Sequence, residues 1–304
     1  MSESSYRLPE DETPEQLVAA LAGLLELEAI EENLFRGPVT HEPWTRVFGG
    51  QVVGQALMAA CRTVDTSERL PHSLHAYFMR PGDATLPIVY QVHRDRDGGS
   101  FTSRRVVAIQ HGKPILNLAC SFQVREEGLR HQADMPDMPG PEGLAEEREL
   151  MLRYVDLIPE KRRPHVFRQR PIEFRPVEQR ARINTEPREP HQAFWFRAVG
   201  PVRDDQVLHR GMLAYASDMA LLGTSLRPHG IDWFKDTLQE ASLDHAVWIH
   251  DDVRIDEWML YTQDSPWSGG GRGMNRGLIY AADGRLVASV AQEGLIRIPR
   301  PRAG

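Results

Sequence analysis

Apolar residues change from helical to strand-like spacing along the first part of the chain. Residues 14–33 repeat apolar side chains at helical intervals, which predicts an amphipathic helix. The run 52–64, VVGQALMAACRTV, is apolar on most sides, a pattern typical of a buried helix. Short segments rich in aromatic and β-branched residues follow, separated by Gly, Pro and Asp. They predict antiparallel strands at 74–81, 86–95, 100–112 and 113–124, with Gly112 at the turn of a hairpin.

The same order returns after a stretch of different composition. Residues 126–170 are dense in charge and proline, which predicts a linker that crosses the surface and carries one short helix near 144–157. Strand-like segments return at 172–178 and 193–200, and HRGMLAYASDMALLGTSL at 209–226 predicts a second mostly apolar helix. Four further strands are expected at 243–252, 257–265, 273–284 and 285–297.

Two short sequences occur twice in weakly similar form. SLHAYFMRPGD is echoed by SLDHAVWIHDD, which aligns His75 with His245, 170 residues apart. QHGKPILNLACSF is echoed by ADGRLVASVAQEG, which aligns Gly112 with Gly284, 172 residues apart. A period this long indicates a duplicated domain. One helix wrapped by an antiparallel sheet, formed twice, predicts an α+β double hotdog whose two sheets continue edge to edge and so protect their strand edges. The expected parts are an N-terminal repeat at 14–125, the linker at 126–170 and a C-terminal repeat at 171–298.

Composition and charge narrow the class of protein. The 41% hydrophobic and 26% charged residues are ordinary for a globular chain. A net charge of −7 argues against a nucleic-acid partner, because phosphate backbones need a basic surface, although a local arginine cluster can still bind a small polyanion. The sequence predicts no signal or transit peptide, no membrane span and no peroxisomal address. Cys61 and Cys120 lie in apolar contexts and are expected to be free buried thiols, which fits a cytoplasmic protein.

Asp218 departs most clearly from the apolar pattern. It lies within MLAYASDMALLGTSL, where an ionised carboxylate is costly unless a partner satisfies it. Ser242 and Gln292 also interrupt strands of the same half. Each residue has a structural interpretation, as the polar side of a helix or as an ordinary strand residue. Together they form a set able to hold and activate one water, since the carboxylate can accept a proton, the hydroxyl can orient the water and the amide can donate or accept. No metal or cofactor is required.

Other polar residues give weaker signals. His72 and His75 have HxxH spacing, but positions three apart on a strand point to opposite faces, which argues against a shared metal. His245 and His250 are expected to be structural. The chain has no GxSxG elbow of a serine hydrolase and no glycine-rich phosphate loop of the Rossmann or Walker type. The run GGGRGMNR at 269–276 fits a flexible hairpin loop, or a loop that lies against phosphates.

Seven motifs occur in order along the chain: LFRGPVTHEPWTRVFGGQVVGQAL, HSLHAYFMRPGD, GGSFTSRRVVAIQHGKPI, RPIEFRPVE, AYASDMALL, SLDHAVWIH and VASVAQEG. Together they resemble the type II acyl-CoA thioesterases, a TesB-like family that includes the peroxisomal acyl-CoA thioesterases. The resemblance implies a double-hotdog fold and hydrolysis of fatty acyl-CoA to free fatty acid and CoA. That family activates water with an Asp, a Thr or Ser, and a Gln, and by motif these fall on Asp218, Ser242 and Gln292. Ser lacks the methyl that restricts a Thr rotamer, so we expect slightly looser positioning of the water.

The implied mechanism uses neither a metal nor a covalent intermediate. Asp218 takes a proton from water as the water attacks the thioester carbonyl. Gln292, or backbone N–H groups of Gly50 and Gln51 at a helix start, are expected to stabilise the oxyanion. The acyl chain should lie between helix and sheet, and the CoA phosphates should meet arginines at the mouth of the cleft. The candidates are Arg80, Arg104, Arg105 and Arg272.

Only the second half of the chain carries the three polar residues, so we expect one active site per chain. Under the offset of 172, the first-half counterpart of Gln292 falls near Cys120. A hotdog hydratase or dehydratase is one alternative, but it would pair an Asp with a His, and no His lies near Asp218 in the sequence. A non-catalytic acyl-CoA-binding or sensor module is the other, although a pure binder has no need for a buried carboxylate. Because hotdog sheets commonly pair, a homodimer or homotetramer is expected.

Overall fold

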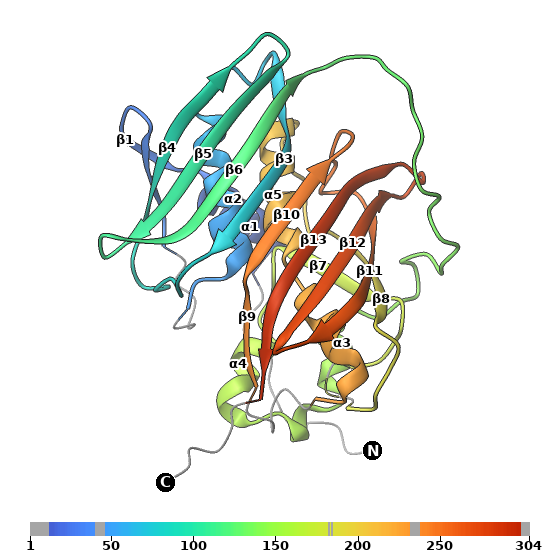
Figure 1. Cartoon of the computed structure of the whole chain (residues 1–304). Helices are drawn as coiled ribbons and strands as arrows, with labels where there is room; N and C mark the ends of the chain where they lie inside the picture. Colours follow the sequence, from blue (N-terminus) through green and yellow to red (C-terminus); the bar gives the residue numbers. More distant parts are fainter. Residues whose placement is uncertain (1–11, 40–45, 182, 184, 232–237, 299–304) are drawn as a thin grey trace.

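Two similar halves form one continuous antiparallel sheet in the computed structural model (Figure 1), which describes residues 12–39, 46–181, 183, 185–231 and 238–298. The first half comprises α1 (Pro14–Leu25), β1 (Glu28–Glu31), β2 (Leu34–Gly37), α2 (Gly49–Cys61), β3 (Arg69–Phe78), β4 (Ile88–Asp97), β5 (Phe101–Gln110) and β6 (Lys113–Val124). The second comprises β7 (Ile172–Pro176), β8 (His191–Ala198), α5 (Gln206–Ser217), η3 (Leu222–His229), β9 (Gln239–Ser242), β10 (Asp244–Ile249), β11 (Met259–Gly269), β12 (Arg272–Ala281) and β13 (Leu286–Arg297).

The strand order shows the duplication directly. It runs β1-β2-β4-β5-β6-β3 in the first half and continues as β10-β13-β12-β11-β8-β7 in the second, which is the same order reversed. The two strands that meet in the middle are the echoed segments, and they pair with each other: His75 lies opposite Ala246 and Ala76 opposite His245. The predicted joining of two sheets edge to edge is therefore confirmed, with each half wrapping a helix as the sequence indicates.

The two buried helices pack against each other in opposite directions inside this sheet. Their contact depends on small residues, because a Cβ on Gly50 of α2 would lie 2.3 Å from the carbonyl oxygen of Tyr215 in α5. Farther along, Gly211 of α5 lies against Met58 of α2. The N-terminus of each helix therefore lies beside the C-terminus of the other. Within the described residues, no helix is long and apolar enough to cross a lipid bilayer.

Two predicted helices end earlier than the sequence suggested. α1 begins with a capping box between Thr13 and Gln16, but it ends at Leu25 rather than 33, because residues 28–31 turn back as β1 to pair with β2. The helix expected at 209–226 is broken after α5 at Asp218, and Ala220 has a φ of 64°. A left-handed residue cannot continue an α-helix. The chain resumes as the separate helix η3, so the carboxylate lies in the break rather than within a helix.

The segment between the repeats does more than cross the surface. Its first part lies along the outer face of the second half, where the Trp195 indole donates to the carbonyl of Pro139. It then forms α3 (Glu147–Leu152), where a helix was expected, followed by η1 (Val155–Leu157), η2 (Glu160–Arg162) and α4 (Arg163–Val166). These short helices bury a small apolar cluster of their own, comprising Leu150, Met151, Val155, Ile158, Phe167, Ala181 and Ile183.

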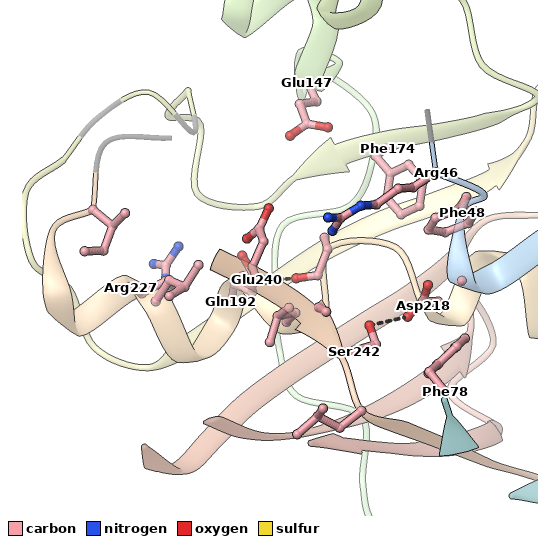
Figure 2. Close-up of a pocket in the computed structure, with 18 of the residues that line it drawn as sticks. Arg46, Phe48, Phe78, Glu147, Phe174, Gln192, Asp218, Arg227, Glu240 and Ser242 are labelled. Carbon is pink, nitrogen blue, oxygen red and sulfur yellow. Dashed lines mark hydrogen bonds between the residues drawn. The ribbon is translucent and has the colours of Figure 1, made fainter. Parts of the chain in front are cut away.

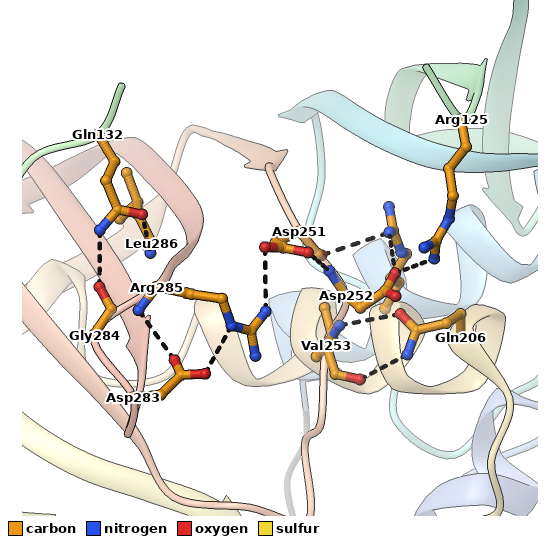
Figure 3. A network of polar contacts seen from close by, with 11 residues as sticks. Arg125, Gln132, Gln206, Asp251, Asp252, Val253, Asp283, Gly284, Arg285 and Leu286 are labelled. Carbon is orange, nitrogen blue, oxygen red and sulfur yellow. Dashed lines mark hydrogen bonds and ion pairs between the residues drawn. The ribbon is translucent and has the colours of Figure 1, made fainter. Parts of the chain in front are cut away.

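A polar network ties the start of this segment to the second half at the N-terminal end of α5 (Figure 3). Arg125 pairs with Asp252 in the loop after β10. Gln132 donates to the carbonyl of Gly284 at 2.8 Å and accepts from the amide of Leu286 at 3.0 Å. The ion pair joins the two repeats, and the Gln132 bonds attach the start of the linker to the second half, at the end of α5 that lies away from Asp218.

Candidate active site

Asp218 lies where the C-terminus of α5 meets the N-terminus of α2. It is the C-cap of α5, and it is 9% exposed. Gly49, the first residue of α2, approaches it so closely that a Cβ at Gly49 would lie 2.7 Å from Asp218 Oδ2. The carboxylate therefore faces the positive end of the α2 dipole, which favours a negative charge at this point.

The structure brings the three predicted polar residues together at one carboxylate oxygen. Gln292 Nε2 donates to Asp218 Oδ1 at 2.5 Å, and Ser242 Oγ donates to the same oxygen at 3.4 Å. Gln292 is 1% exposed, while Ser242 is only partly buried. Among the described residues, both hydrogen bonds to this carboxylate go to Oδ1, so Oδ2 is left facing Gly49. Figure 2 shows the Ser242–Asp218 contact in the wall of a pocket.

A β-bulge aims the side chains of the second half into this site. β9 and β10 both pair with β13: Ser242 lies opposite Gly294 and Ala246 opposite Ala291, so four steps on one strand face three on the other. In a regular strand, Ser242 and His245 would point to opposite faces because they are three positions apart. The extra residue lets both point inward, as bulges beside active sites commonly do.

The pocket beside Asp218 has a volume of about 640 Å³, within the range of small-molecule sites. Aromatic and aliphatic side chains surround the carboxylate, and Figure 2 shows Phe48 and Phe78 on its side of the pocket with Arg227 toward the opposite end. The apolar lining near Asp218 includes Phe48, Val52, Phe78, Phe174, Phe194 and Leu222. A carboxylate at the end of an apolar cavity is suited to reactions on a substrate with a long apolar part.

Charged residues gather at the other end of the pocket, and the sequence interpretation missed most of them. Glu178 forms ion pairs with Arg227 at 2.5 Å and with Arg188 at 3.2 Å. Partial burial raises the pKa of Glu178, but the hydrogen bond and charge of Arg227, with the other arginines, outweigh it and lower the pKa overall. Arg188 has two further guanidinium nitrogens, Nε and Nη2, that are buried without a partner among the described residues. These donors could bind an anionic group. No sequence motif marked them, because the arginines lie in irregular segments before β8 and in η3.

The four arginines predicted to bind phosphates have different positions. Arg80 does line the pocket. Arg104 is 2% exposed and donates to Thr63 Oγ1 at 2.9 Å, at the opposite end of α2 and roughly 18 Å along the helix from Gly49. Its prediction as a phosphate ligand is wrong, because its guanidinium is buried in protein contacts. The other two lie outside the pocket lining, paired with carboxylates on the surface: Arg105 with Asp95 and Arg272 with Glu293.

The predicted backbone donors also need revision. Gln51 N–H donates to the carbonyl of Phe48 at 3.1 Å, and the Cα of Gly50 faces α5. Of the glycines at this helix start, Gly49 lines the pocket. Within the described residues, α2 begins without a side-chain cap, since its N-cap is Phe48. The first N–H groups of a helix have no partner inside the helix, so this N-terminus can accept a ligand.

The first half has a structural counterpart of this site, but with different residues. Gln292 lies opposite Asn275 across β12 and β13, and at the matching position across β5 and β6 Cys120 lies opposite Arg104. Arg104 bonds Thr63, just past the end of α2, as Gln292 bonds Asp218 at the end of α5. Burial raises the pKa of Cys120 to about 12, so this thiol is not a nucleophile at neutral pH.

His245 is the main residue whose place the sequence did not indicate. Its Nδ1 lies 3.1 Å from Gln292 Nε2, and its Nε2 lies 2.9 Å from Ser217 Oγ. A histidine is therefore linked to Asp218 through the side chain of Gln292, contrary to the expectation from their separation in the sequence. His75 is exposed on the outer face, against the ring of Trp248. Within the described ranges, no three His, Cys, Asp or Glu side chains are grouped as a metal site would need.

Comparison with known proteins identifies the family. Residues 40–123 match the acyl-CoA thioesterase N-terminal domain, and residues 132–296 match the acyl-CoA thioesterase C-terminal domain. Acyl-coenzyme A thioesterase 8 of Homo sapiens is 44% identical over 283 residues, which cover 90% of this chain and 88% of that protein. Acyl-CoA thioesterase 2 of Haemophilus influenzae is 37% identical, covering 91% and 96%. The crystal structure of the acyl-CoA thioesterase II TesB2 from Mycobacterium marinum is 42% identical and superimposes with a TM-score of 0.76, covering 92% and 98%. The strand order, the double-hotdog fold and these matches agree, and the chain is a thioester hydrolase that belongs to the type II acyl-CoA thioesterase family.

Proposed function

We propose that the protein hydrolyses fatty acyl-CoA by attack of a water molecule that Asp218 deprotonates. The water oxygen bonds to the thioester carbonyl carbon while its proton passes to the carboxylate. The C–S bond then breaks, the CoA thiolate leaves, and the proton returns to the sulfur. The products are a free carboxylic acid and CoA. The observation that carries this proposal is the convergence of Gln292 and Ser242 on one oxygen of a buried carboxylate.

Each member of the trio has a distinct part in this proposal. Gln292 fixes the carboxylate with a short bond, and Ser242 can donate to Asp218 while its lone pairs accept from the water. Both amide hydrogens of Gln292 point at protein acceptors, Asp218 and His245. No N–H of Gln292 remains for the oxyanion. We therefore assign oxyanion stabilisation to the backbone N–H of Gly49 at the uncapped start of α2.

The charged end of the pocket suits the phosphates of CoA. Arg188 contributes two buried donors that have no partner among the residues the structure describes, and Arg227 lies beside it on the shared carboxylate Glu178. Arginine binds phosphate through paired N–H groups. The acyl chain would lie in the apolar part around Phe48 and Phe78. The chemistry needs no metal or cofactor, because a thiolate is a good leaving group. The cytoplasmic location and the homodimer or homotetramer stay predictions.

The test compares wild type with Asp218→Asn on acyl-CoAs from acetyl to palmitoyl, following release of free thiol. Wild type should release CoA, and Asp218→Asn should lose at least about 100-fold in kcat, since general-base catalysis typically contributes that much. Calorimetry with a non-hydrolysable acyl-CoA analogue should show that the variant still binds. Turnover by Asp218→Asn near the wild-type rate would remove the carboxylate from the role of base. Binding by wild type without any turnover would favour a binding module instead.

A further inference from the structure

His245 is fully buried on β10 between two polar side chains and does not line the pocket. Its Nδ1 lies 3.1 Å from Gln292 Nε2, and its Nε2 lies 2.9 Å from Ser217 Oγ. Since Asp218 Oδ1 is bonded to the same amide nitrogen of Gln292, the imidazole is one hydrogen bond away from the proposed base. A buried polar ring in this position either fills space or fixes the groups that it contacts.

The contacts define which nitrogen of His245 carries the proton. Gln292 Nε2 is a donor with two hydrogens, one directed at Asp218 and the other at His245, so Nδ1 must be an acceptor. Ser217 Oγ donates its own hydrogen to the carbonyl of Ala214 at 3.0 Å, so it can accept from Nε2–H. The chain of donors and acceptors is complete only for a neutral imidazole protonated at Nε2. Burial lowers the pKa of His245 despite the nearby carboxylates of Asp218 and Asp244, in agreement with a neutral ring.

The oxygen side of the Gln292 amide has no hydrogen bond to the described residues that would fix its orientation. Its Oε1 is buried and has no hydrogen-bond partner among the described residues. If the amide turned over, Oε1 would face both the Asp218 carboxylate and the lone pair of His245 Nδ1, and the base would lose its shortest hydrogen bond. The orientation of Gln292 is therefore set on the side of Asp218 and His245 alone.

We infer that His245, oriented by Ser217, is a positioning residue that holds the Gln292 amide with its nitrogen toward Asp218. This inference rests on the function proposed above. A single hydrogen bond to Asp218 would not fix the plane of the Gln292 amide, because the terminal side-chain torsion of glutamine has a broad distribution of angles. A second acceptor on the opposite hydrogen fixes the amide plane. Ser217 is itself the last residue of α5, so the ring connects β10, which follows directly after Ser242, to the helix that presents the base.

Two substitutions distinguish the roles of the two ring nitrogens of His245. In His245→Asn, the amide oxygen can occupy the place of Nδ1 and accept from Gln292, while the bond to Ser217 is lost. In His245→Gln, the longer amide can donate to Ser217 from the place of Nε2, while the acceptor for Gln292 is lost. Asn is one methylene shorter than Gln and leaves the larger gap in the core, so His245→Asn should have the lower Tm. A purely structural histidine therefore predicts that His245→Asn is no more active than His245→Gln.

The experiment measures kcat and KM for acyl-CoA hydrolysis in both variants, together with Tm. We expect His245→Gln to lose about 100-fold in kcat with KM within a factor of two, because small misplacement of a catalytic group has effects of that size. His245→Asn should recover most of this loss. In the Gln292→Ala background, His245→Gln should lower kcat by no more than about two-fold, since the residue it positions is gone.

Equal kcat values for the two His245 variants, or an undiminished loss in the Gln292→Ala background, would overturn the positioning role. That result is distinguishable from failure of the proposed function through a third variant. If Asp218→Asn is inactive and His245→Gln is fully active, only the inference on His245 fails. If Asp218→Asn turns over like wild type, the proposed base fails, and the role of His245 fails with it.

Discussion

Gly49→Ala is the smallest change that should disturb the proposed base without altering its chemistry. The added methyl would lie 2.7 Å from Asp218 Oδ2 and 3.1 Å from the ring of Phe78, whereas ordinary contacts of a Cβ begin at 3.4 Å. Relief of the first contact alone requires a shift of about 0.7 Å, the difference between 3.4 and 2.7 Å. Gln292 and Ser242 hold the carboxylate from the other side, so the movement would lengthen the bonds that orient it. The backbone N–H of residue 49 is retained.

The expected loss follows from that displacement. Misplacement of a reacting group by about 1 Å can lower the rate by about 100-fold, so a shift of this size should lower kcat at least about 10-fold. KM should change little, because the CoA end of the pocket is distant from α2. The assay is release of free thiol from a saturating acyl-CoA, with Tm measured on the same preparation. Alanine is the better helix former, so the variant should still fold.

Gly23→Ala provides a matched control. Gly23 lies in α1 with no atom near the position of an added Cβ, so the same substitution should leave kcat unchanged and raise stability by roughly 0.5–1 kcal/mol. A Gly49→Ala variant with wild-type kcat would refute the reasoning. It would mean either that the α2 terminus yields without moving Asp218, or that the position of this carboxylate does not limit the reaction.

Three further predictions address arginine and histidine side chains. Arg188→Ala should raise KM for acyl-CoA about 10-fold through loss of charge-assisted bonds, but it should change KM little for an acyl-pantetheine that lacks the nucleotide. Arg105→Ala should affect neither KM. An equal rise for both substrates in Arg188→Ala would place Arg188 away from the phosphates. Arg104→Met should lower the free energy of unfolding by about 2 kcal/mol in urea titrations without changing KM, because the buried guanidinium bonds to Thr63 are lost and their acceptors are left unpaired. A raised KM at unchanged stability would restore Arg104 as a CoA ligand. Burial lowers the pKa of His209 and His245, so these rings stay neutral in the native state while the unfolded chain takes up protons below about pH 6.5. Tm should therefore decrease as the pH is lowered from 7.5 to 5.5. A Tm that stays constant or increases as the pH is lowered would contradict neutral rings in the native state.

Periodicity was sufficient for the long elements of the fold and for the duplication, because buried helices and paired strands impose strong patterns. It failed where tertiary contacts decide the local conformation. The strand β1 has no apolar alternation of its own and forms by pairing with β2, and Ala220 gives no sign in the sequence that it will be left-handed. Asp218 could be singled out because a carboxylate in an apolar run is conspicuous. Arg188 and His245 could not, since an arginine in a loop and a histidine in a strand are ordinary until their neighbours in space are known.

The contrast between the two helix junctions gives a physical reason for the expectation of one active site per chain. At the junction of α2's end with α5's start, the N-terminus of α5 is capped by Asp205, whose carboxylate accepts from the amides of Val207 and Leu208. Those amides are then unavailable to a ligand, and Arg104 fills the place that corresponds to Asn275. At the other junction the cap residue is Phe48, which has no side-chain acceptor, and Gly49 leaves room for the carboxylate of Asp218. The two features that differ are a helix N-terminus without a side-chain cap among the described residues and a carboxylate facing it. The proposed mechanism uses both, as a donor for the developing oxyanion and a base for the water. Supplying them at the first junction would require removal of the Asp205 cap, replacement of Arg104 and a carboxylate in place of Thr63, so no single one of these changes should create a second site.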